Sequence, residues 1–202
     1  VSGLGVAVFG VTRGLTAWAA RPAHPVVFEL GRGQAPEDSA LEAAVAALQE
    51  ASAGPGPSAR TYGNLALLQL ERARRAGPGA PEFMAWIHSA VEAQRAGLAL
   101  APANGSGWAR LTYAEKLRAQ APGATPEGLA AAQALEMSFL TRDLSFSLVR
   151  FRLEAALDDW ATLRPWLRDA ARREVHELTR YGARGMDALV ELYLRSPHPD
   201  II

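Results

Sequence analysis

The sequence predicts an all-α protein made of antiparallel helix pairs. Apolar residues recur at spacings of three and four along most of the chain, which is the period of a helix that buries one face. Clusters of glycine and proline separate these stretches and mark short loops. No stretch alternates apolar and polar residues between hairpin turns, so strands are not expected. Helices joined by short loops pack as antiparallel neighbours.

Residues 1–21 are predicted to form a membrane-anchoring helix. A helix of this length is roughly 30 Å long, which matches the hydrocarbon core of a bilayer. Arg13 interrupts the apolar run, and an arginine in the middle of a bilayer is costly. Either the span ends just before Arg13, or Arg13 faces a partner. In the first case Arg13, Trp18 and Arg21 are interfacial anchors at the lipid headgroups.

Two further features of this segment bear on its role. Small residues recur at steps of four, three, four and three, which places them on one helical face: Gly3, Ala7, Gly10, Gly14 and Ala17. Such a stripe favours packing against another membrane helix, although glycine and alanine are frequent throughout the chain. A signal peptide is the competing interpretation, because residues 17–19 have the small-x-small pattern of a cleavage site.

The rest of the chain is expected to hold a linker, one helical domain and a tail. Residues 22–36 contain two early prolines and Gly31-Arg32-Gly33, which is typical of a linker, with a short extended or helical piece at 26–30. The helical domain is expected over 37–196 and the tail over 197–202. Helices are expected at about 36–52, 59–75, 81–100, from 106, 126–140, 146–160 and 165–181, and around 186–193.

Capping residues support several of these boundaries. Thr125 is followed by Pro126, which suits the first position of a helix, and by Glu127 in the first turn. Pro165 suits the first turn of the next-to-last helix, and Gly182 is expected to end it in a left-handed conformation. Helix pairs are expected to begin near residues 59, 106 and 143. The spacing between these starts lies within the range of helical solenoid units.

Residues 90–117 resemble the tetratricopeptide repeat (TPR) family. Ala90 and Pro102 stand twelve residues apart, as the small residue and closing proline of that family do, and Trp108-x2-Leu111 follows as the start of a next repeat. Thr112 and Glu115 stand where the family has Gly and Tyr. The resemblance implies a short TPR-like solenoid that binds a protein partner. In the predicted fold this solenoid follows the N-terminal membrane helix.

The C-terminal part is also similar to TPR-like, membrane-anchored proteins found with bacterial polysaccharide biosynthesis. The residues that carry this similarity are Arg150-x-Arg152-Leu153, Trp160-x2-Leu163 and Arg168. It implies a role in polysaccharide biosynthesis or export.

Composition excludes several classes of function. The 21 basic and 21 acidic residues balance, without a basic block, so a nucleic-acid partner is not expected. The chain has no cysteine, which removes disulfides, thiolate metal sites and thiol nucleophiles. The bias toward Ala, Arg, Gly and Pro, with one lysine, is associated with a GC-rich bacterial genome.

No constellation of residues points to catalysis, a cofactor or a metal. His176-Glu177 begins like the zinc protease motif, but Arg180 stands where the second histidine is required. The four histidines lack metal-ligand spacing, and no glycine-rich phosphate loop occurs. We therefore predict no catalytic, cofactor-binding or metal-binding residues.

Three arginines, Arg142, Arg150 and Arg152, surround the start of the helix at 146 and are candidate contacts for an acidic partner or a lipid phosphate. The alternative is a solvated helix face. Four tryptophans of the helical domain form either an aromatic binding surface or part of the core, and the core is favoured.

These features lead to one main hypothesis and two alternatives. The first is a non-catalytic scaffold anchored in the bacterial inner membrane, which contacts lipid and holds a protein partner. The second is an accessory subunit of a bioenergetic membrane complex, docked by its N-terminal helix. The third is a soluble helical enzyme.

Overall fold

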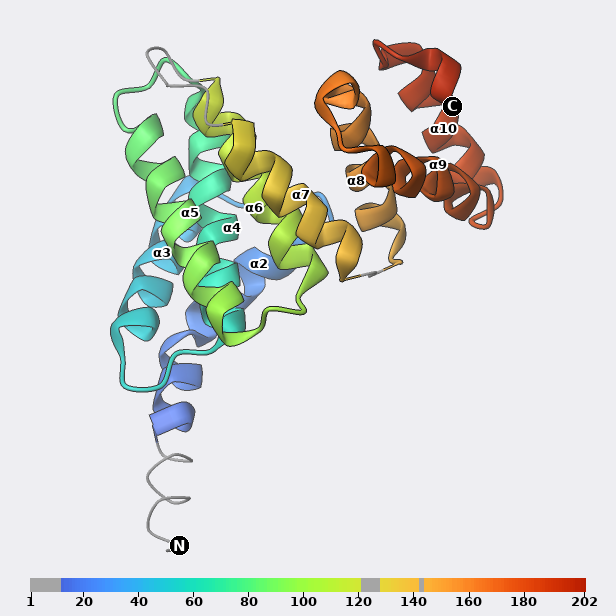
Figure 1. The fold of residues 1–202 in the computed structure, drawn as a ribbon. Helices are drawn as coiled ribbons and strands as arrows, with labels where there is room; N and C mark the ends of the chain where they lie inside the picture. The colour runs from blue at the N-terminus through green and yellow to red at the C-terminus, as the bar shows by residue number, and fades with distance from the viewer. Residues whose placement is uncertain (1–11, 121–127, 142–143) are drawn as a thin grey trace, which may run out of the picture. The chain divides into compact units, whose positions relative to one another are not determined.

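The computed structural model describes residues 12–120, 128–141 and 144–202, and every regular element in these ranges is a helix (Figure 1). This confirms the all-α fold class. The chain divides into two compact units where the sequence favours one helical domain. Unit 1 comprises residues 1–102 and 117–126, and unit 2 comprises residues 103–116 and 127–202. The first boundary follows Pro102, a residue that cannot continue a helix.

Unit 1 is centred on α4, which contacts both α3 and α5. Its elements are the 3-10 helix η1 (Arg21–Ala23), α2 (His24–Gly31), α3 (Asp38–Ala53), α4 (Ala59–Ala76) and α5 (Phe83–Leu100). Apolar residues that the sequence places on one face of each helix form its core: Leu41, Val45 and Leu48 of α3, with Leu65 and Leu68 of α4. Residues 12–19, before η1, are also helical.

The sequence favours a linker over residues 22–36, with a short extended or helical piece at 26–30. The structure has a helix there, α2, which is longer than that piece and directly follows η1. Ala20, Ala23 and Val26 stand at helical spacing and are buried in the core of unit 1. Pro22 and Pro25 lie in the first turns of η1 and α2, where a missing N–H breaks no hydrogen bond. The prolines therefore begin these helices, and the small apolar residues fix them to the unit.

The start of α4 depends on a side-chain cap. The hydroxyl of Ser58 accepts a hydrogen bond from the backbone N–H of Thr61 at 3.0 Å. Ser58→Ala is expected to lower the free energy of unfolding by about 1 kcal/mol, measured by urea denaturation. The matched control is Ser52→Ala, since the Ser52 hydroxyl donates only to the Gln49 carbonyl inside α3. Equal losses in the two variants would contradict a capping role.

Unit 2 is centred on α8, which contacts α7, α9 and α10. Its elements are α6 (Gly105–Ala119) up to Lys116, α7 (Gly128–Leu140), α8 (Phe146–Asp158), the 3-10 helix η2 (Trp160–Thr162), α9 (Pro165–Thr179), α10 (Ala183–Arg195) and the 3-10 helix η3 (Pro199–Ile201). Leucines at helical spacing form much of the core: Leu135, Leu153, Leu157, Leu167, Leu178, Leu189 and Leu192.

Two boundaries in unit 2 differ from the expected ones. The α9 helix begins at Pro165, as predicted, but ends at Thr179, before Gly182. Gly182 has a φ of 62°, which favours glycine, and it precedes α10 instead of closing α9. The expected tail at 197–202 contains η3, and its two isoleucines, Ile201 and Ile202, pack against the core of unit 2.

Helices that are neighbours in the chain also pack together, as in a helical hairpin. The α4 and α5 helices form one such pair, and α8 and α9 form another. In Figure 1, α3, α4 and α5 lie side by side. Stacking of the pairs into a TPR-like solenoid stays a prediction.

Candidate functional site

The first sequence-predicted site is the stripe of small residues near the N-terminus. Gly3, Ala7 and Gly10 lie outside the described residues. Gly14 and Ala17 lie on the exposed side of the helix at 12–19. Apart from the neighbouring backbone of this helix, no atom of the described residues lies within 4 Å of a Cβ placed at Gly14. In the part of the chain that the structure describes, no helix is both long and apolar enough to cross a bilayer.

The described part of the N-terminal segment has one buried and one exposed face. Thr16 and Ala20 are buried, which fixes this side of the segment to unit 1. The opposite side exposes Leu15 and Trp18, at 58% and 74% of their surface. The predicted anchors Arg13 and Arg21 are also exposed. Tryptophan is enriched at membrane interfaces, and the interfacial role of Arg13, Trp18 and Arg21 stays a prediction.

Arg152 is not a contact for a partner, which corrects the sequence-based prediction. Its side chain is completely buried, and Nε and Nη2 donate to Oε1 of Glu174 at 2.9 and 2.6 Å. The guanidinium also lies 5.5 Å from the ring centroid of Phe139. A charge inside a core requires such a partner, since desolvation is otherwise too costly. Arg152 therefore joins α8 to α9 and has a structural role.

The other two arginines of this predicted cluster give no common surface. Arg150 is partly exposed and forms an ion pair with Glu191 of α10, with 2.8 Å between Nη2 and Oε2. Arg142 lies outside the described residues. An external anion that binds Arg150 must compete with the carboxylate of Glu191.

An exposed apolar stripe on α10 was not predicted as a site. It consists of Met186, Val190, Tyr193 and Leu194, which are exposed at 50%, 55%, 53% and 75%. The opposite side of α10 faces the core of unit 2 through Ala188, Leu189 and Leu192. The spacing of the stripe is visible in the sequence, but spacing alone does not tell which of two apolar faces is buried.

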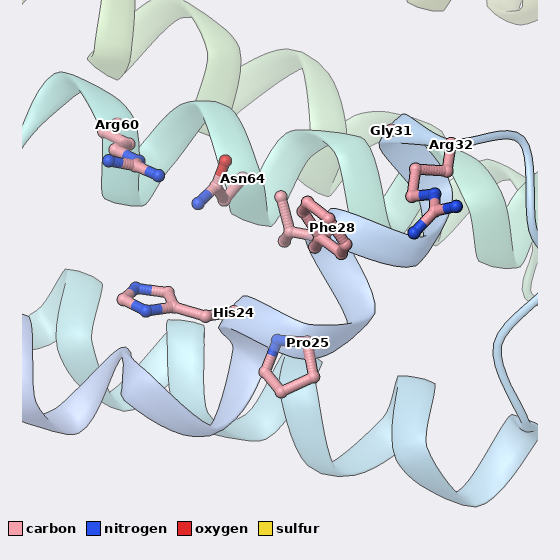
Figure 2. Close-up of a pocket in the computed structure, with 8 residues that line it drawn as sticks. His24, Pro25, Phe28, Gly31, Arg32, Arg60 and Asn64 are labelled. Carbon is pink, nitrogen blue, oxygen red and sulfur yellow. The ribbon is translucent and has the colours of Figure 1, made fainter.

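A pocket of about 660 Å³ lies in unit 1 between α2 and α4. Figure 2 shows Arg60 and Asn64 on α4 facing the side where His24 and Phe28 of α2 lie. The remaining lining residues are Pro25, Val27, Gly31 and Arg32. The lining thus combines three basic side chains and one amide with an apolar wall, and it includes no carboxylate.

A smaller pocket of about 370 Å³ lies in unit 2, between α6 and α8. Its lining includes Arg110, Tyr113 and Phe151. Burial lowers the pKa of Arg110, but an arginine remains protonated at neutral pH even so. Arg110 already takes part in an interaction, so this pocket is a weaker candidate for an external anion than the one in unit 1.

Two residues of the incomplete zinc protease motif, Glu177 and Arg180, form an ion pair with each other. Arg180 donates to both carboxylate oxygens of Glu177, at 3.0 and 2.9 Å. Within residues 12–120, 128–141 and 144–202, no three His, Asp or Glu side chains form a group that could hold a metal ion.

The four tryptophans of the helical domain are partly buried and do not lie fully in the core. The most exposed of them, Trp166, has 36% of its surface accessible.

No protein-family model, curated protein or solved structure matches the chain. The TPR-like resemblance and the similarity to polysaccharide-associated proteins therefore stay predictions. Functional assignment rests on the surfaces and pockets of the two units.

Proposed function

We propose that the protein is a non-catalytic scaffold, held at a bacterial membrane by its N-terminal segment, that binds a protein partner through its helical domain. The observation that carries this proposal is the exposed apolar stripe on α10. Polysaccharide biosynthesis or export is the process that the sequence similarity favours.

The stripe has the properties of a contact surface for another protein. Its four residues follow the i, i+4, i+7, i+8 spacing of one helix face, so they form a continuous surface. Contiguous apolar patches on soluble domains mark interaction sites more often than isolated apolar residues do. Tyrosine and methionine are also enriched at protein interfaces.

Attachment to a membrane is supported by the N-terminal segment. Leu15 and Trp18 are largely exposed on the helix at 12–19, and Arg13 and Arg21 lie near them in sequence. Aromatic and basic side chains together favour the headgroup region, where the ring is half in lipid and the charge stays in water.

The test is co-purification of the full chain with its partner in mild detergent. Val190→Gln combined with Leu194→Gln keeps the helix-forming tendency of α10 but removes two apolar contacts. We expect the amount of the stoichiometric partner to fall at least about tenfold, which corresponds to roughly 1.4 kcal/mol of binding free energy. Asp187→Gln, at an exposed position of the same helix, is the matched control and should leave the partner bound.

Two other outcomes would change the proposal. If the partner stays bound to the double variant at its original stoichiometry, α10 is not the contact surface. If Gly14→Ile releases the partner while the double variant retains it, the N-terminal helix is the docking element. That result would favour an accessory subunit of a membrane complex.

A further inference from the structure

We infer that the pocket between α2 and α4 binds the phosphate group of an anionic phospholipid. Arg60 and His24 would hold the phosphate, and Phe28 would contact the apolar part of the lipid. The inference rests on the proposed attachment to a membrane, and the test below separates the two.

Two arginines, Arg32 and Arg60, line this pocket. Neither Arg32 nor Arg60 forms an ion pair with any carboxylate of the described residues. The other arginines of α4 differ, because Arg72 pairs with Glu42, and Arg74 and Arg75 pair with Glu71. The pocket therefore contains positive charge that no carboxylate of the described residues neutralises through an ion pair.

An apolar wall lies beside these charges. Phe28 is exposed over 65% of its surface, and the guanidinium of Arg32 lies 5.7 Å from its ring centroid. Pro25 and Val27 extend the apolar lining. A small inorganic anion would use the basic groups but leave this wall in water. An amphiphile with an anionic head matches both parts.

The hydrogen-bond donors that line the pocket suit a phosphate group. Arginine offers paired N–H donors that match the oxygens of a phosphate, and the imidazole of His24 and the amide of Asn64 offer further donors. In Figure 2 Arg60 and Asn64 lie on α4, and His24 lies across from them on α2, with Phe28 further along α2. A phospholipid joins such a phosphate to acyl chains through glycerol, so one molecule supplies a group for the basic side chains and a group for the apolar wall.

The α2 wall of the pocket follows the exposed N-terminal segment closely in the chain. The helix at 12–19, which carries Leu15 and Trp18, leads through η1 directly into α2. His24 is the first residue of α2. A segment that lies at the headgroups up to Arg21 brings the next residues of the chain to the same level, where anionic lipids are available.

The test is vesicle binding by the full chain, with vesicles of phosphatidylcholine alone or of phosphatidylcholine mixed with phosphatidylglycerol. We expect tighter binding to the mixed vesicles, and we expect Arg60→Gln to weaken that binding by about five- to tenfold. Arg95→Gln is the matched control, because it removes the same charge from a half-exposed position of α5 in the same unit. It should change binding less than about twofold.

A second readout does not depend on membrane affinity. The His24 imidazole signal, assigned by its loss in His24→Gln, should shift in the NMR spectrum when short-chain phosphatidylglycerol is added, and it should stay fixed in Arg60→Gln. Circular dichroism is the control for folding, and we expect both variants to keep their helices.

The outcomes separate the pocket from the membrane attachment. If the protein binds both kinds of vesicle equally and Arg60→Gln has no effect, the pocket inference is overturned while membrane attachment stands. If it binds no vesicle, membrane attachment fails as well. If inorganic phosphate shifts the His24 signal and phosphatidylglycerol does not, the ligand is a soluble phosphate and the lipid assignment is wrong.

Discussion

Glu174→Ala is expected to lower the free energy of unfolding of unit 2 by about 3 to 5 kcal/mol, as removal of one partner from a buried ion pair does. Arg152 is completely buried and donates two hydrogen bonds to Glu174. Glu174→Ala removes this carboxylate and leaves the guanidinium charge, which arginine side chains retain in proteins, without its carboxylate partner. The folded state then holds an uncompensated charge, while the unfolded state hydrates it.

Urea denaturation followed by circular dichroism and tryptophan fluorescence measures this effect. The matched control is Glu136→Ala, which removes the carboxylate that pairs with the largely exposed Arg164 of unit 2. That loss should be about 1 kcal/mol or less, because water screens an exposed pair. A loss of less than 1 kcal/mol for Glu174→Ala would show that water or another group reaches Arg152.

A double substitution separates the cost of an unpaired charge from the value of the pair. Arg152→Met combined with Glu174→Leu keeps most of the volume but removes both charges. Replacing a buried ion pair by apolar side chains is often neutral or stabilising by about 1 to 4 kcal/mol. We expect this variant to be at least about as stable as the original protein and more stable than Glu174→Ala.

The same pair shows why the sequence could not identify the role of Arg152. On α8, Arg152 follows Val149 at a spacing of three and precedes Ala156 at a spacing of four, so it lies among buried residues of the helix. An arginine there suits either a solvated edge or a buried pair. The deciding partner, Glu174, lies 22 residues further along the chain, which is beyond any local pattern.

Helix positions were more predictable than the surroundings of each helix. The stripe Leu41, Val45, Leu48 identifies α3 because one-sided burial leaves a regular spacing in the sequence. By contrast, α10 has apolar residues on two faces, and only tertiary packing decides that Leu189 is buried while Val190 is exposed. The prolines and glycines around α2 favoured a linker, although Ala20, Ala23 and Val26 have the helical spacing of residues that pack against unit 1.

The second large effect is expected for Gly185→Ala in α10. A Cβ at this position would lie less than 3.0 Å from both the carbonyl oxygen and the carbonyl carbon of Leu178, which are backbone atoms of α9. It would also lie 3.3 Å from the Cβ of Tyr181. Backbone cannot rotate away as a side chain can, so the start of α10 must move.

That movement would disturb the core of unit 2. Leu178 is completely buried, and Leu189 and Leu192 of α10 belong to the same core cluster. Overpacking a core costs about 1 to 3 kcal/mol, and more when backbone has to shift. We therefore expect Gly185→Ala to lower the free energy of unfolding by about 3 kcal/mol, although alanine favours a helix more than glycine does.

Two other glycines provide a graded comparison by urea denaturation. At Gly97 an added Cβ would lie 3.1 Å from the Ala59 carbonyl oxygen, so Gly97→Ala should have a smaller effect. At Gly79 no atom lies within 4 Å, and Gly79→Ala should stay within about 0.5 kcal/mol of the original protein. If helix propensity decided the outcome, both helical substitutions would be stabilising. If close approach of the helices decides it, the loss increases from Gly79 through Gly97 to Gly185.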